Sequence, residues 1–392
     1  MKRIAFVDDD KNVLDGLRRM LRCNRKEWQM SFFLSGDEFL SSLDDNSFDI
    51  IVSDMRMPHM NGGELLAKVK ELSPSTLRIV LSGYANEEMI LESLHATHQF
   101  ISKPADSDRI TKSINRALRL QESLCERELK SLMGSIGSLP ALPVVYDELM
   151  RETCSDDSSL ERVGDIISRD VGLSASILKI VNSAFFALVR HIESPSQAAS
   201  ILGMDTLKNL ALSTSVFSCF SSGQSGVEEI ERLNRDSQRV GVLCGKIAKE
   251  SNLSARAIDH GQIAGMMCNL GALIALVYPS LMVGLGDDES RLPHIGSYLL
   301  GIWAMPFPVV EAVRWHQCPA DSQIEEMSPL AVLHFSWAML TAHGEGGEGV
   351  EITLENDRLD LDYLGAVVGA ETLRQWVRVT EEFCDQVDCK DD

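Results

Sequence analysis

The chain has 392 residues, with 37 Lys and Arg against 58 Asp and Glu, and a formal net charge of −21 at pH 7. Domains commonly contain about 100–200 residues, so this length predicts two or three domains, each with its own core. Hydrophobic residues make up 44% of the chain and charged residues 24%, a composition that excludes wholesale disorder.

The negative charge is concentrated in the second part of the chain. Residues 1–125 carry 17 basic and 19 acidic side chains, whereas the remainder carries 20 and 39. A surface this acidic repels phosphate backbones and anionic lipids. We therefore expect neither nucleic acid nor a membrane among the partners.

Cysteine use and hydropathy indicate the compartment. The nine cysteines are scattered without a Cys-x-x-Cys pair, which is typical of a reducing cytoplasm. No run approaches the roughly 18 consecutive apolar residues of a membrane span. The apolar stretch at 4–7 runs directly into three aspartates and is too short for a signal peptide. We expect a soluble, cytoplasmic protein.

Strand-length apolar runs alternate with helical patterns over residues 1–121. The runs are 4–7, 30–34, 50–52, 79–81 and 100–101. Four of the five lack polar alternation, which is typical of parallel strands buried on both faces. The alternation predicts a doubly wound α/β domain with a five-stranded parallel sheet.

Polar side chains follow these runs, at the strand ends where such sheets carry their chemistry. They are Asp8, Asp9 and Asp10 after the first run, Asp54 after the third, Ser82 after the fourth and Lys103 after the fifth. Carboxylates that converge on one edge repel each other unless a cation lies among them, and Mg²⁺ prefers such oxygen ligands. An ammonium and a hydroxyl can both bind a phosphoryl group. The pattern predicts a site for Mg²⁺ and phosphate.

This set of residues resembles the receiver domain of two-component response regulators, over residues 1–121. The resemblance implies a flavodoxin-like fold in which a histidine kinase or phosphotransfer protein phosphorylates Asp54. It implies that Asp8, Asp9, Asp54 and the backbone carbonyl of Arg56 hold Mg²⁺.

The resemblance also assigns residues that respond to phosphorylation. Ser82 is the switch hydroxyl, Phe100 the switch aromatic and Lys103 the phosphate partner. The three histidines of this part, His59, His95 and His98, are expected on the surface rather than as ligands.

A helical connector is predicted after the α/β domain. No Pro or Gly interrupts residues 109–133, where apolar residues recur at helical spacing. The last helix of the first domain is therefore expected to run on through a linker at 122–135. A helix packed along its own second domain and a coiled-coil homodimer contact both fit this short repeat.

Helical patterns punctuated by prolines fill the chain from residue 136 to about residue 343 and predict an all-α domain. Stretches at 139–143, 182–186, 192–203 and 294–303 resemble the HDOD domain, the HD-related output domain of bacterial signalling. The resemblance spans 136–343 and relates this half to HD-type phosphohydrolases, including the HD-GYP phosphodiesterases of cyclic di-GMP.

The metal ligands of an HD-type hydrolase are not found in this half. Such a site needs a His, an adjacent His-Asp pair and a further Asp around a metal. Cys268 and Asn269 stand in the place of the pair, and Asp236 stands at the earlier His position. We expect no hydrolase activity, with Cys268 as a small core residue.

The remaining histidines of the helical half give no metal pattern. His260 follows Asp259 in reversed order and in a different register, and no carboxylate lies at ligand spacing from His294, His316 or His334. Hydrogen bonding in the core or at the surface is expected for them.

Residues 344–392 are predicted to form an acidic linker followed by a C-terminal helical extension. Glycine and glutamate alternate over 344–349. Apolar residues that include Trp376 then predict one or two amphipathic helices, and we expect this tryptophan to dock onto its own domain. Cys384 and Cys389 are expected as surface thiols.

The two resemblances together imply a phosphorylation-controlled response regulator whose non-catalytic output domain signals by protein contact. By analogy of folds, one such partner is an HD-GYP phosphodiesterase. The alternatives are a divergent HD-type phosphodiesterase, a DNA-linked transcriptional regulator, and a scaffold whose receiver no longer switches. The acidic second half, which has no basic recognition helix, argues against DNA.

Overall fold

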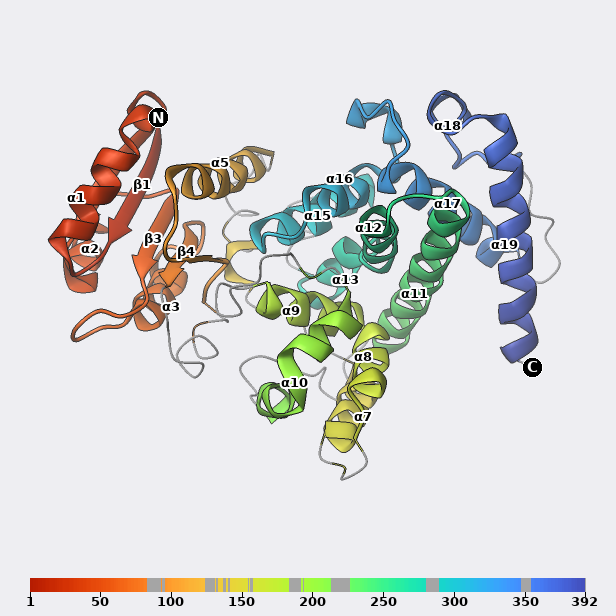
Figure 1. The fold of residues 1–392 in the computed structure, drawn as a ribbon, viewed down its shortest axis with the longest axis horizontal. Helices are drawn as coiled ribbons and strands as arrows, with labels where there is room; N and C mark the ends of the chain where they lie inside the picture. Colours follow the sequence, from red (N-terminus) through yellow and green to blue (C-terminus); the bar gives the residue numbers. More distant parts are fainter. Residues whose placement is uncertain are drawn as a thin grey trace.

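The protein consists of an α/β domain followed by a larger helical domain, and the two termini lie at opposite ends of the molecule (Figure 1). The computed structural model describes residues 1–82, 93, 96–123, 131, 133–136, 139, 142–153, 155, 158–182, 192, 194–212, 226–279, 289–346 and 354–391.

Strands and helices alternate in the α/β domain. In chain order they are β1 (Lys2–Val7), α1 (Lys11–Met20), the 3-10 helix η1 (Arg22–Lys26), β2 (Trp28–Phe33), α2 (Gly36–Ser42), β3 (Ile50–Asp54), α3 (Gly62–Leu72), β4 (Leu77–Ser82), β5 (Gln99–Ser102) and α5 (Ser107–Ser123).

The five strands form one sheet in the order β2-β1-β3-β4-β5, and every pairing is parallel. The predicted doubly wound sheet is therefore confirmed. Successive side chains point to opposite faces of a strand, so β1 contributes Ile4 and Phe6 to one apolar layer and Ala5 and Val7 to the other. The first layer includes residues of α1 and α5, and the second includes residues of α2 and α3.

The predicted second strand was placed too late in the chain. Instead of 30–34, β2 spans Trp28–Phe33, because Trp28 is 2% exposed and pairs with Lys2 at the start of β1. Leu34 is 46% exposed and its N–H donates to the Glu38 carboxylate at 2.8 Å. Leu34 therefore belongs to the start of α2 rather than to the strand.

The described part of the second half is helical. Its elements are α7 (Pro143–Thr153), α8 (Leu160–Ser168), α9 (Val171–Val181), α10 (Pro195–Leu212), α11 (Val227–Glu250), α12 (Ala255–Met266), α13 (Leu270–Val277), η3 (Glu289–Arg291), α15 (Leu292–Ile302), α16 (Phe307–Trp315), η4 (Pro319–Ser322), α17 (Pro329–Gly346), α18 (Leu361–Val367) and α19 (Ala370–Asp391). The predicted all-α architecture agrees with these elements.

One apolar stretch of the helical half has the length of a membrane-spanning segment. Residues Ala255–Val277 are long and apolar enough to cross a membrane by length and composition. An 18-residue window within them has a mean hydropathy of 1.4, and 67% of that window is buried within the protein. A turn at 267–269 divides it into α12 and α13. Because α12 packs against α11, α16 and α17, and α13 packs against α15, the stretch forms a core of the helical domain.

Buried histidines of the helical domain hydrogen-bond to main-chain atoms, as expected. His316 is 1% exposed and its Nδ1–H donates to the Val313 carbonyl at 2.8 Å. His334 is fully buried: its Nδ1–H donates to the His316 carbonyl at 2.7 Å, and its Nε2 accepts the Asp360 N–H at 2.9 Å. The His334 ring is neutral, because its Nε2 accepts a backbone N–H and cannot carry a proton. Burial lowers the pKa of both rings, which favours the neutral form of His316 as well.

The pKa of His316 predicts a pH dependence of stability. Burial lowers this pKa to about 4 from an ordinary value of 6.5. Below pH 6.5 the unfolded chain takes up a proton that the native ring refuses, so the free energy of unfolding falls as the pH drops toward 4, by up to about 1.4 kcal/mol per pH unit. His316→Asn keeps a donor near Val313 without titrating, and should flatten this slope in urea unfolding at several pH values. His59→Asn, at an exposed position, should leave the slope unchanged. Equal slopes in wild type and His316→Asn would contradict burial of a neutral ring.

The C-terminal extension folds back onto the helical domain. Trp376 of α19 is fully buried, its Nε1–H donates to the Ser251 hydroxyl at 2.8 Å, and its ring packs edge-on against Phe335. Two helices, α18 and α19, form this extension, and the predicted docking of Trp376 is confirmed.

Two expectations for this segment are wrong. Cys384 is 3% exposed rather than a surface thiol, because it lies with Phe383 on the face of α19 that joins the core. Cys389 lies where side chains are outside the described part. Helix α17 continues to Gly346, so the backbone is still helical where the acidic linker was expected to begin.

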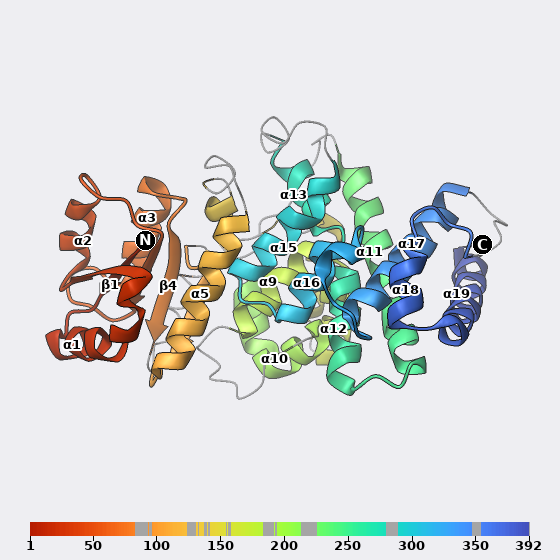
Figure 2. The same ribbon diagram turned by 90° about the horizontal axis from the view of Figure 1, so that it is seen from above.

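The two domains share one apolar core. The layer beneath α1 and α5 continues through Met133, Ile136 and Leu139 into the core of the helical domain. Helix α5 packs against α15 and lies between the sheet and the helical domain in both views (Figures 1 and 2). The predicted continuation of this helix is described as far as Ser123, and residues 124–130 are outside the described part.

Candidate functional site

The candidate site lies at the carboxyl ends of β1, β3 and β5. Register places Val7 of β1 beside Ser53 of β3, so the next residues in each strand, Asp8 and Asp54, are neighbours. Asp8 is 4% exposed. This edge lies at the reversal of strand order between β1 and β3, which is where open α/β sheets bind ligands.

Lys103 joins the two carboxylates. Its ammonium donates to Asp8 Oδ2 at 3.0 Å and also contacts Asp54 Oδ1. Burial alone would lower the pKa of Lys103, but the hydrogen bonds and charges of Asp54 and Asp8 outweigh burial and raise it. The site therefore keeps a fixed positive charge next to the Asp54 oxygen at neutral pH.

Backbone groups orient the Asp54 carboxylate. The Arg56 N–H donates to Asp54 Oδ2 at 2.6 Å, so both carboxylate oxygens have a donor. Helix α3 begins directly beside this loop, with Asn61 as its N-cap in a capping box with Glu64. A Cβ on Gly62 would lie 2.1 Å from the Asp54 carbonyl oxygen, so only glycine allows this close approach of α3.

The donor set fits a hydrated Mg²⁺. Asp8 and Asp54 converge on one point, and Mg²⁺ is usually bound by one or two carboxylates while it keeps several waters. Among the described residues, no group of three His, Cys, Asp or Glu side chains lies close enough together to enclose a metal. Asp8 and Asp54 would therefore be the carboxylates that hold Mg²⁺, with water completing its coordination.

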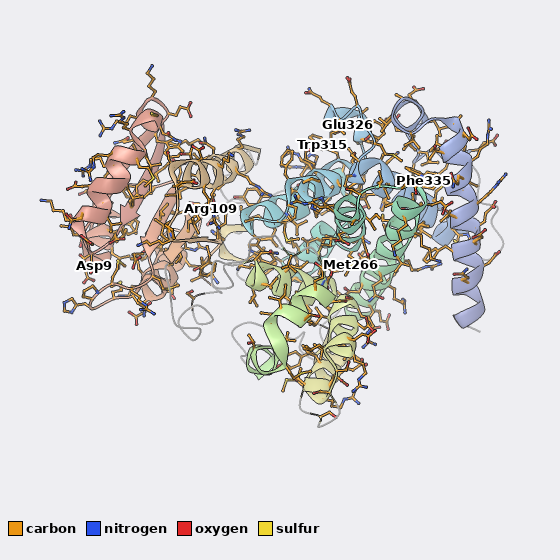
Figure 3. The ribbon with its side chains drawn as sticks, viewed as in Figure 1. Asp9, Arg109, Met266, Trp315, Glu326 and Phe335 are labelled. Atoms are coloured by element: carbon orange, nitrogen blue, oxygen red, sulfur yellow. The ribbon has the colours of Figure 1, made fainter. Side chains whose placement is uncertain are left out.

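The other sequence-predicted residues are placed as follows. Asp9 is exposed and lies at the end of the α/β domain away from the helical domain (Figure 3). The Ser82 backbone ends β4, opposite Ser102 of β5, and its side chain is outside the described part. Phe100 is half-buried in β5 and contacts both apolar layers. The ligand roles of Asp9 and the Arg56 carbonyl, and the switch roles of Ser82 and Phe100, remain predictions.

The expectation of a surface position for His98 is wrong. His98 is 3% exposed, and its Nδ1 accepts the Arg78 N–H at 3.0 Å while its Nε2–H donates to the Gly134 carbonyl at 3.0 Å. Burial and the Arg78 guanidinium lower its pKa far below the usual range. His98 is therefore a neutral bridge between β4 and residue 134. His95 lies outside the described residues.

Arg78 is a functional candidate that the sequence analysis did not single out. Its guanidinium is fully buried and donates to the carbonyls of Ala96 at 2.5 Å and Thr76 at 3.0 Å, and to that of Gly134. A charged residue inside the apolar run 77–81 was the signal that could have identified it. We call the contacts of Arg78, His98 and Gly134, together with those of α5 on α15, the interdomain interface.

Cation contacts extend this interface into the helical domain. Arg116 of α5 donates to the Met305 carbonyl just after α15. Lys179 of α9 lies 4.9 Å from the centre of the Trp303 ring, and its pKa is lowered well below the usual range, first by burial and then by Arg78. Two cations, Arg78 and Lys179, thus approach each other from opposite domains.

The residues that stand at the metal-ligand positions of an HD-type site differ in their solvent exposure. Cys268 is 4% exposed, and burial raises the pKa of its thiol, so it is not a thiolate at neutral pH. Asn269 is the N-cap of α13. Asp236 has a side chain 45% exposed that pairs with Arg232 at 3.6 Å.

Comparison with known proteins identifies both domains. Residues 4–115 match the family model of the response regulator receiver domain, and residues 139–291 match that of the HDOD domain. The transcriptional regulatory protein FixJ of Rhizobium meliloti is 30% identical over 163 residues, which are 37% of this chain and 78% of FixJ.

Two further curated relatives match the chain. An uncharacterized protein of Treponema pallidum is 28% identical over 217 residues, which are 51% of this chain and 41% of that protein. The transcriptional regulatory protein ZraR of Salmonella typhimurium is 29% identical over 161 residues, 40% of this chain and 36% of ZraR. The chain thus spans only about two-fifths of the length of these two relatives.

A solved structure also resembles the first domain. The signal receiver domain of an HD domain-containing protein from Pseudomonas fluorescens Pf-5 is 26% identical, covers 31% of this chain and 98% of that one, and gives a TM-score of 0.30. The chain belongs to the response regulators, with an N-terminal receiver domain and a C-terminal HDOD domain. A receiver domain implies a histidine kinase or a phosphotransfer protein as its phosphodonor.

Proposed function

We propose that the protein is a bacterial, cytoplasmic switch in which phosphorylation of Asp54 changes what the HDOD domain offers to a partner protein. The observation that carries the proposal is the contact of Lys103 with both Asp54 and Asp8, at the end of the strand that leads into α5. Helix α5 also packs on α15 of the helical domain. The phosphate site and the interdomain interface are therefore joined by a short, continuous segment.

The chemistry required of Asp54 follows from its surroundings. An Asp54 oxygen attacks the phosphorus of the donor's phosphohistidine, so that an O–P bond forms while the P–N bond breaks and the imidazole leaves. Lys103 is placed to bind an oxygen of the transferred group, because its ammonium already contacts Asp54. Mg²⁺ held by Asp8 and Asp54 would supply neutralisation of the phosphoryl charge when bound.

Transfer of a phosphoryl group to Asp54 adds negative charge beside Lys103 and so changes the interactions that hold its ammonium in place. The ammonium has two carboxylates as partners before transfer, and a phosphoryl group competes with Asp8 for it. A shift of Lys103 moves the segment between β5 and α5, and a shift of α5 alters its contacts with α15. Coupling of this kind is a population shift between two arrangements, which phosphorylation biases toward one.

The output domain is proposed to act by protein contact rather than by hydrolysis. Cys268 is buried and burial raises the pKa of its thiol, which favours a small core residue over the His of an HD-type site. His316 and His334 hold their rings in main-chain hydrogen bonds. An HD-GYP phosphodiesterase is one partner to test, by analogy of folds.

Hydrogen exchange tests the coupling directly. The full chain is compared with and without beryllofluoride and Mg²⁺, which together mimic the aspartyl phosphate. We expect changed protection in peptides from both α5 and α15 for wild type, and no change for Asp54→Ala. Protection changes confined to the β-strand ends would contradict coupling to the HDOD domain.

Capture from native cell extract tests the output. Wild type is expected to retain a protein in a beryllofluoride-dependent manner, and Asp54→Ala is expected to lose that dependence. If no captured protein depends on beryllofluoride, the protein-contact proposal fails. Bound-metal analysis and a cyclic dinucleotide hydrolysis assay then test the alternative of a divergent phosphodiesterase.

A further inference from the structure

A groove with one positively charged wall lies between the two domains. It has a volume of about 600 Å³ and is lined by residues of α5 on one side and of α16 and η4 on the other. We call it the α5–α16 groove. Its volume falls in the range of about 300–1,000 Å³ that is typical of pockets for small molecules.

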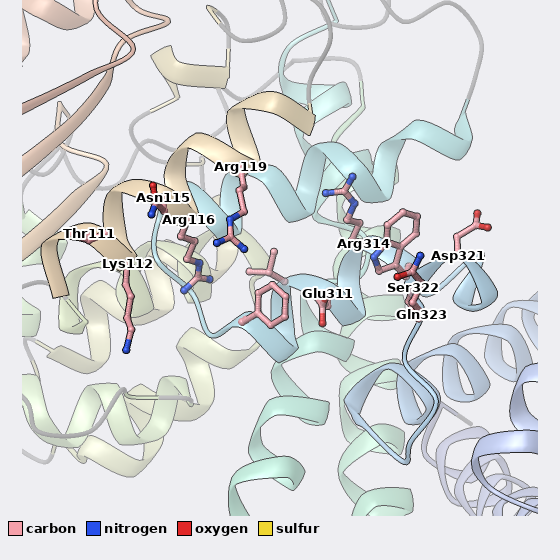
Figure 4. Close-up of a pocket in the computed structure, with 13 residues that line it drawn as sticks. Thr111, Lys112, Asn115, Arg116, Arg119, Glu311, Arg314, Asp321, Ser322 and Gln323 are labelled. Carbon is pink, nitrogen blue, oxygen red and sulfur yellow. The ribbon is translucent and has the colours of Figure 1, made fainter. Parts of the chain in front are cut away.

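Cations without carboxylate partners dominate the groove. Lys112, Arg116 and Arg119 follow one another at helical spacing on one face of α5, and Arg314 stands on α16. None of the four forms an ion pair within 4 Å with a side chain that the structure describes. Figure 4 shows Arg116 and Arg119 extending from α5 toward α16.

Two of these cations are partly buried. Burial lowers the pKa of both Arg116 and Arg314, and Glu311 offsets only part of the shift for Arg314. A buried guanidinium is stabilised by an anion placed against it. Such a concentration of positive charge is notable on a chain with a net charge of −21.

The spacing of the α5 cations indicates the length of the anion. Residues 112 and 119 lie about 10 Å apart along the helix axis, at 1.5 Å per residue. Two linked phosphates contact cations over more of this length than a single phosphate does. The Arg119 guanidinium also presents paired donors that match phosphate oxygens, while Arg116 already gives one N–H to the Met305 carbonyl.

The opposite wall offers an aromatic face and acceptors. Phe307 begins α16 and is 59% exposed within the groove lining, and Trp315 ends the same helix with the Arg314 guanidinium 4.8 Å from its ring centre. Aromatic rings of this kind stack on nucleobases. The carboxylates of Glu311 and Asp321 lie in the same wall and can accept N–H groups of a base.

We propose that the α5–α16 groove binds a nucleoside diphosphate, with its phosphates on the α5 cations and its base on the Phe307 side. The ligand contacts both domains at once, so binding stabilises their present arrangement. Binding itself does not require phosphorylation of Asp54, and only its regulatory use rests on the proposed function.

Titration calorimetry on the full chain tests this, with GDP and pyrophosphate as probes. We expect saturable GDP binding, weakened about tenfold or more by Arg119→Ala. Phe307→Ala should weaken GDP to a similar degree while pyrophosphate binding stays as in wild type, because pyrophosphate has no base to stack. The matched control is Arg109→Ala, which removes an exposed cation of the same helix outside the groove and should leave both affinities unchanged.

Other outcomes overturn the proposal. Absence of saturable GDP binding to wild type rejects the site. Equal weakening by Arg109→Ala and Arg119→Ala shows general charge attraction instead of a site, and equal affinity for pyrophosphate and GDP removes the base from the proposal. Asp54→Asn is expected to bind GDP like wild type. The phosphorylation switch and the ligand site in the α5–α16 groove can therefore be rejected independently of each other.

Discussion

Asp54→Asn is expected to abolish phosphorylation of the chain. Asparagine keeps the size of the side chain and an oxygen that can accept the Arg56 N–H. The amide is neutral and is not a nucleophile toward phosphorus, so the O–P bond does not form. Intact-mass measurement after incubation with acetyl phosphate and Mg²⁺ should show one added phosphoryl group on wild type and none on the variant.

The surrounding carboxylates make this a strict test. Asp8 shares the Lys103 ammonium with Asp54, so it is the nearest alternative acceptor. Asp45→Asn, at an exposed position away from the strand ends, should be phosphorylated like wild type. A phosphoryl group found on Asp54→Asn, and mapped by peptide mass to Asp8 or Asp9, would show that Asp54 is not the sole acceptor.

The sequence predicted the sheet well because its strands are buried on both faces and therefore lack polar alternation. In β2 the pattern misled at both ends. Trp28 joins the core although polar Gln29 follows it, and apolar Leu34 is exposed beside the N-cap of α2. Local patterns define the existence of an element better than its ends.

Asp8, Asp54 and Lys103 could be predicted together because parallel strands bring their carboxyl ends to one edge. The interdomain interface could not be predicted in this way. Arg78, His98 and Gly134 meet through contacts between segments that no sequence period relates. The sequence around Gly134 and Gly137 is typical of a flexible linker. In the structure, however, the Gly134 carbonyl accepts hydrogen bonds from two buried donors.

Gly134→Ala is expected to open the interdomain interface. A Cβ at this position would lie 2.0 Å from the Pro74 carbonyl oxygen, a backbone atom that cannot rotate away. Displacing residue 134 removes its carbonyl from Arg78 and His98 and leaves buried donors unsatisfied. At about 1–3 kcal/mol for each of these two groups, the docked arrangement should lose about 2–6 kcal/mol.

Small-angle scattering and hydrogen exchange measure this effect. We expect a larger radius of gyration and faster exchange in α5 and α15, while the sheet core keeps its protection. The matched control is Gly16→Ala on α1, where an added Cβ meets nothing within 4 Å and should stabilise the helix by about 0.5–1 kcal/mol. A Gly134→Ala protein as compact as wild type would contradict the role of this contact. If the interface transmits phosphorylation, the same variant should still accept a phosphoryl group at Asp54, but beryllofluoride should no longer alter protection in α15.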